Sequence, residues 1–134
     1  MKDILVERNR DFFAEYLSLK AKLPDFRSIK KQHIYDMAIK MKAPRFYIDL
    51  DTAITYIQFM KRGVFPPQLK SKTDSKRKQM CKDLYDTFLV CQKQYPTWYE
   101  RDIVEKAILS PAPSFYIDTQ VARLIINKGN CGKI

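Results

Sequence analysis

Apolar side chains recur along the chain at intervals of three, four and seven residues, in six separate segments. In the first segment, over residues 3–22, Leu5, Phe12, Tyr16 and Leu19 set this spacing. It is typical of one face of an amphipathic helix. The same spacing predicts further helices over about 28–41, 50–62, 75–94, 98–109 and 119–128. The sequence therefore predicts an all-α fold with about six helices.

The chain also repeats itself. The string Ala-Pro-Arg-Phe-Tyr-Ile-Asp at residues 43–49 returns at 112–118, an offset of 69, with serine in place of the arginine. Aligned apolar positions extend the match on both sides. This self-similarity predicts a tandem duplication of a three-helix unit, with a first repeat at 1–63 and a second repeat at 75–134. We expect a basic, proline-containing linker at 64–74 and expect the two repeats to pack as one compact body.

Local signals mark where the helices begin and end. Asp49 and Asp118 are predicted to cap the third helix of each repeat, and Thr97 to cap the second helix of the second repeat. Gly63 and Gly129 are predicted to stop the third helices. A short extended Phe-Tyr-Ile segment is expected before each third helix. An Ala-Pro pair stands just ahead of each segment, and the proline bars helical geometry at its alanine.

Positive charge is concentrated at the junction between the repeats. The chain carries a net charge of +10, and the segment from Lys61 to Lys82 holds eight basic residues against one acidic residue, Asp74. A dense basic block favours a polyanionic partner, most simply the phosphates of duplex DNA. A solvated linker that keeps the protein in solution is the competing interpretation.

Candidate contacts follow from this block and from the repeated string. The cations at the predicted start of the fourth helix lie where free backbone N–H groups also favour an anion. The second and third helices of a repeat could form a helix-turn-helix-like pair, although the connection from Met41 to Asp49 is longer than usual. The candidate nucleic-acid-binding residues are Arg45, Lys61, Arg62, Lys70, Lys72, Lys76, Arg77 and Lys78.

Other chemistry has little support in the sequence. No phosphate-binding glycine loop, nucleophile elbow or zinc-binding HExxH motif is present, so we expect no enzyme, no cofactor, no metal site and no small-molecule substrate. Cys81 and Cys91 fall on an apolar helix face and are expected to be buried, whereas Cys131 is expected to be a free thiol. No apolar run is long enough to cross a membrane.

The repeated string followed by an alanine-containing helix resembles a motif in small uncharacterised proteins of gut-bacterial phages and mobile elements. The resemblance covers about 30 residues of each repeat and implies a phage or mobile-element setting, in the cytoplasm of a bacterial host cell or in the virion. Ser114 departs from the motif in the second repeat. Two functions follow as expectations: a DNA-binding regulator or packaging factor, or a structural or adaptor protein that holds other proteins of a particle.

Overall fold

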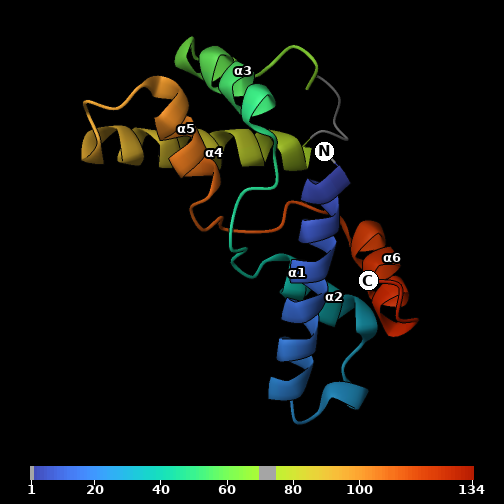
Figure 1. Cartoon of the computed structure of the whole chain (residues 1–134). Coiled ribbons are helices and arrows are strands. Elements are labelled where there is room, and N and C mark those ends of the chain that lie inside the picture. The colour runs from blue at the N-terminus through green and yellow to red at the C-terminus, as the bar shows by residue number, and fades with distance from the viewer. Residues whose placement is uncertain (1, 70–74) are drawn as a thin grey trace. The chain divides into compact units, whose positions relative to one another are not determined.

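The structure, a computed structural model, describes residues 2–69 and 75–134, which form six α-helices and one short 3₁₀ helix without a β-sheet (Figure 1). This confirms the all-α prediction, and the longest helices begin and end within a residue of their predicted limits. The helices are α1 (Lys2–Lys22), α2 (Lys31–Ile39), α3 (Leu50–Lys61), α4 (Ser75–Gln94), α5 (Glu100–Ile108) and α6 (Thr119–Asn130), and the 3₁₀ helix is Phe26–Ser28.

The helices form two compact units, and each unit draws on both predicted repeats. Unit 1 comprises Met1–Ala43 with Pro113–Ile134, and unit 2 comprises Pro44–Ala112. In unit 1, α1, α2 and α6 pack against one another, and in unit 2, α3, α4 and α5 do so. Each predicted repeat therefore contributes two helices to one unit and its third helix to the other. The repeat boundaries predicted at residues 63 and 75 do not coincide with the boundaries of the units.

The chain passes between the units at two Ala-Pro pairs. Pro44 and Pro113 are the first residues after the two boundaries, and proline disfavours helical geometry at the alanine before it. α2 ends at Ile39 and α5 at Ile108, each before its Ala-Pro pair, and the chain then continues into the other unit.

A backbone hydrogen bond then anchors each incoming segment. In unit 2 the Phe46 N–H donates to the Ile108 carbonyl at 2.9 Å, and in unit 1 the Phe115 N–H donates to the Ile39 carbonyl at 3.2 Å. The two bonds join aligned pairs of residues in the two repeats. Each bond lies within one unit, and its donor and acceptor are far apart in the sequence.

Aliphatic, aromatic and small side chains fill the two cores. Ala38, Ala107 and Ala122 are fully buried, and a small side chain there lets neighbouring backbones approach closely. In unit 1, the ring of Phe12 meets the ring of Phe115 edge to face, with centroids 5.3 Å apart and an interplanar angle of 79°. That contact joins α1 to the segment that leads into α6.

The predicted aspartate caps are confirmed. An Asp49 carboxylate oxygen accepts a hydrogen bond from the Thr52 N–H at 3.2 Å, and Asp118 accepts one from the Val121 N–H at 2.8 Å. The predicted cap at Thr97 is wrong, because α5 begins two residues later than that cap requires and its N-cap residue, Tyr99, makes no side-chain capping bond.

One of the two predicted glycine stops is confirmed. Gly63 follows α3 with a φ of +78°, a conformation that side chains with a Cβ rarely adopt. Gly129 instead lies inside α6, and the positive φ after that helix belongs to Gly132. The position of Gly129 requires a glycine for another reason, because a Cβ there would collide with the ring of Phe13 on α1.

The two Phe-Tyr-Ile segments differ in conformation. Both are non-helical, but Tyr116 has a φ of +54°, in the left-handed region, whereas no positive φ is found at its aligned counterpart Tyr47. The Ser114 hydroxyl oxygen accepts a hydrogen bond from the Tyr116 N–H at 3.1 Å and supports this turn. The serine that replaces arginine in the second repeat therefore has a local structural role.

Candidate nucleic-acid interface

The candidate basic residues that the structure describes all belong to unit 2. They lie in the repeated string, at the end of α3 and at the beginning of α4, two helices that pack against each other. Lys70 and Lys72 lie outside the described residues. The described candidates are Arg45, Lys61, Arg62, Lys76, Arg77 and Lys78.

Lys61 is engaged within the protein. Its ammonium group forms an ion pair with Glu100 of α5 at 2.5 Å, and Gln58 donates a hydrogen bond to the same carboxylate oxygen. The Lys61 ammonium also lies 5.5 Å from the centre of the Phe88 ring. Because its charge is balanced by Glu100, Lys61 is the weakest candidate for a phosphate contact.

Arg62, Arg77 and Lys78 contact neutral aromatic groups instead. The Arg62 guanidinium lies 5.5 Å from the centre of the Phe59 ring, and the Lys78 ammonium 5.8 Å from that of Phe65. A cation held over an aromatic ring keeps its full positive charge. These contacts restrict the side chains without neutralising them.

Arg77 donates a hydrogen bond from Nη1 to the Tyr56 hydroxyl at 3.3 Å, which ties the start of α4 to α3. Lys76 is exposed. No ion pair with another residue of the described ranges is formed by Arg62, Lys76, Arg77 or Lys78. Successive residues of a helix point about 100° apart. Lys76, Arg77 and Lys78 therefore do not share one face: the first two are exposed, and Lys78 is half-buried.

Arg45 is held by its own neighbours. Its Nε donates to the Phe46 carbonyl at 3.0 Å, and its guanidinium lies 5.8 Å from the centre of the Tyr47 ring. The side chain is half-buried. Arg45 is thus fixed against the segment that enters unit 2.

The sequence suggests that α2 and α3 form a helix-turn-helix-like pair, but the two helices belong to different units. α2 belongs to unit 1 and contacts α1 and α6, whereas α3 belongs to unit 2 and contacts α4 and α5. The connection between α2 and α3 crosses the boundary between the units, which explains why it exceeds the usual turn length.

A nucleophilic role for the cysteine next to this region is disfavoured by its pKa. Burial raises the pKa of the Cys81 thiol to about 11, and the nearby Arg77 only partly opposes this effect. The thiol is protonated at neutral pH and packs as a small apolar group. Among the described residues, no group of three histidine, cysteine or acidic side chains is placed to hold a metal ion.

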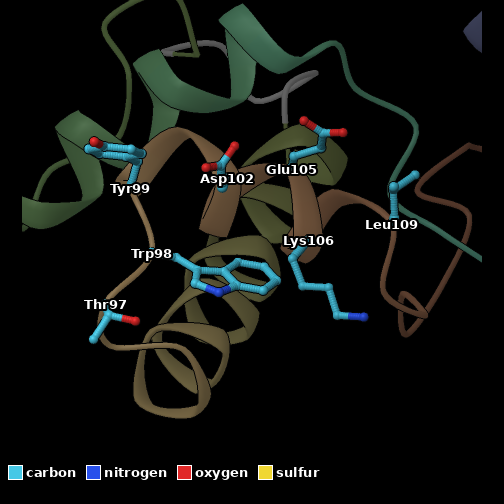
Figure 2. A pocket seen from close by; sticks show the side chains of 7 residues that line it. All are labelled: Thr97, Trp98, Tyr99, Asp102, Glu105, Lys106 and Leu109. Atoms are coloured by element: carbon cyan, nitrogen blue, oxygen red, sulfur yellow. The ribbon is translucent and has the colours of Figure 1, made fainter.

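Sequence reasoning missed a second surface feature of unit 2. An open groove of about 530 Å³ runs along α5, and Figure 2 shows the side chains that line it. The aromatic cluster around Pro96 was the available signal, but periodicity did not reveal its exposure. The lining residues are Thr97, Trp98, Tyr99, Asp102, Glu105, Lys106 and Leu109.

Together these features define the class as an all-α protein whose second unit carries a basic helix start and an aromatic groove. No helix in the described ranges has the length and apolar character needed to cross a bilayer. Comparison with protein-family models, with curated proteins and with solved structures gives no match.

Proposed function

We propose that this chain is a small basic DNA-binding protein that contacts phosphates through the end of α3 and the start of α4. One observation carries the proposal: Arg62, Arg77 and Lys78 are oriented by neutral aromatic partners and so keep their charge. With the exposed Lys76 they make a group of cations without an ionic partner among the described residues.

The position of Lys76, Arg77 and Lys78 in the first turn of α4 strengthens the argument. The first turn of α4 has no acidic residue, although an acidic side chain there would favour the helix dipole. Cations in that turn cost about 0.3–1 kcal/mol each at most. The N–H groups of the turn and the adjacent cations favour the same ligand, an anionic oxygen.

The phosphates of duplex DNA are the proposed partner of these cations. Duplex DNA presents one negative charge for about every 1.7 Å of its axis, and binding cations release condensed counterions. Lys70 and Lys72, which lie between the two helices in sequence, and Arg45 are further candidates from the sequence. The resemblance to phage and mobile-element proteins favours a regulator or a packaging factor in such a setting.

The alternative function is that of a structural or adaptor protein. It is favoured by the exposed apolar side chains along α5, of which Tyr99 is 83% and Leu109 is 55% exposed. Large apolar side chains that gather at the surface indicate a protein contact.

Fluorescence anisotropy of a labelled DNA duplex at low salt tests the proposal. The intact protein is compared with a variant that carries Lys76→Glu, Arg77→Glu and Lys78→Glu. We expect the variant to bind at least about tenfold more weakly, because three cations of the proposed contact region become acidic and repel phosphates. Circular dichroism checks that the variant retains its helices.

A charge-matched control separates a local contact from a general loss of charge. Lys31→Glu, Lys42→Glu and Arg123→Glu change three exposed cations of unit 1 and lower the net charge by the same amount. We expect this control to bind DNA much more tightly than the α4 variant. Equal losses in both variants would contradict the site, and absence of binding by the intact protein would contradict the function.

A further inference from the structure

The groove along α5 has a rigid aromatic floor. The ring of Trp98 stacks on the ring of Tyr95, with centroids 4.0 Å apart and an interplanar angle of 18°. Trp98 nevertheless remains 43% exposed. The stack holds the indole in place and leaves part of it available to a ligand.

Two carboxylates lie on the same groove. Asp102 and Glu105 are three residues apart on α5, and Leu109 follows four residues later, so all three share one face of the helix. In Figure 2, Asp102 and Glu105 follow Tyr99 along one side of the groove, and Trp98 and Lys106 lie on the other.

The two carboxylates lack an ionic partner among residues 2–69 and 75–134. Neither Asp102 nor Glu105 forms an ion pair with a residue of the described ranges, whereas Glu100, at the start of the same helix, pairs with Lys61. Of the described residues that line the groove, Lys106 is the one cation. The groove therefore has a surplus of negative charge in a chain with a net charge of +10.

We propose that this groove docks an arginine-bearing segment of a partner protein. A guanidinium stacks on an aromatic face and donates two hydrogen bonds to a carboxylate. The groove offers both partners, with Trp98 on one side and the two acids on the other. The apolar groups Tyr99 and Leu109 accommodate the rest of such a segment. The carboxylates repel phosphates, so this surface is distinct from the proposed DNA contact.

Trp98 is the only tryptophan in the chain and reports on the groove directly. Its fluorescence is followed while an acetylated Gly-Arg-Leu-Arg-Gly peptide is added to the full chain. The matched peptide carries citrulline, which has the shape of arginine without its charge. We expect a saturable change with the arginine peptide, weakened by salt, and little change with the citrulline peptide.

Variants then assign the binding to the carboxylates. Asp102→Asn with Glu105→Gln preserves shape, and we expect it to weaken peptide binding by about threefold to tenfold. The matched control, Glu15→Gln with Asp86→Asn, removes two charges elsewhere and is expected to leave binding unchanged.

Three results would overturn the inference. The first is equal binding of the two peptides, and the second is unchanged binding by the Asp102→Asn, Glu105→Gln variant. The third is self-association in sedimentation velocity that the same variant abolishes, because the occupant would then be a second copy of this chain. We expect the Asp102→Asn, Glu105→Gln variant to bind duplex DNA as the intact protein does. A failure of the groove proposal can therefore be distinguished from a failure of the DNA-binding proposal.

Discussion

Substituting Phe12 and Phe115 with leucine, singly and together, tests whether α1 packs against the segment that leads into α6. The two rings meet edge to face at 5.3 Å, although they belong to different predicted repeats. If each repeat folded on itself, Phe12 would instead pack against Phe46, the residue aligned with Phe115. A double-mutant cycle distinguishes these two arrangements.

The burial of the two rings sets the expected magnitude. Phe12 is 0% exposed and Phe115 is 2% exposed. Truncation of either to alanine would cost roughly 3–5 kcal/mol, and small domains are stable by only roughly 5–15 kcal/mol. Leucine is therefore the safer substitution. An edge-to-face pair contributes about 0.5–1.5 kcal/mol beyond burial, and we expect a coupling energy in that range.

Urea unfolding followed by circular dichroism supplies the four free energies of unfolding. The same cycle with Phe12 and Phe46 is the control, and we expect additivity within about 0.5 kcal/mol there. Coupling between Phe12 and Phe46, with additivity between Phe12 and Phe115, would refute the exchange of third helices between the repeats.

Three further predictions concern single groups. Asp118→Ala removes the α6 cap and should lower the free energy of unfolding by about 0.5–2 kcal/mol in urea titrations. Hydrogen bonds from Thr52 lower the pKa of Asp49, so its charged form stabilises the fold above the pKa of the unfolded chain, and this contribution is lost as the pH falls through the folded pKa. The melting temperature of Asp49→Asn should therefore lie below that of the intact protein at neutral pH and converge with it in acid. A thiol reagent at neutral pH should modify the exposed Cys131 rapidly, and the buried Cys81 and Cys91 only after denaturation; rapid modification of all three in the folded protein would contradict the described burial.

The helices could be predicted from the sequence because each has a local cause. Spacing of apolar residues gives α1 and α4 their lengths, and Asp49 and Asp118 fix where α3 and α6 begin. The pairing of the helices could not be predicted in the same way. The repeats have nearly the same apolar pattern, so this pattern does not indicate which pair of helices α3 or α6 packs against. In the structure the chain passes from one unit to the other at Pro44 and again at Pro113.

Charge density in the sequence indicates the candidate basic residues, but the state of each cation depends on distant partners. Lys61 is balanced by Glu100, which lies 39 residues away, and Arg77 is bound to Tyr56, which lies 21 residues away. Such pairs follow from how α3, α4 and α5 pack and leave no local signal. Trp98 differs, because its stacking partner Tyr95 is close in sequence, but apolar periodicity does not show that the indole is left 43% exposed.

The salt dependence of duplex binding by two single-site variants tests the central claim most directly. Lys76→Gln removes an exposed cation without an ionic partner in the described ranges, whereas Lys61→Gln removes one that is paired with Glu100. We predict that Lys76→Gln lowers the slope of log K against log salt by about 0.9, the value for one phosphate contact. Lys61→Gln should leave the slope unchanged. A slope that falls with Lys61→Gln and not with Lys76→Gln would contradict the account.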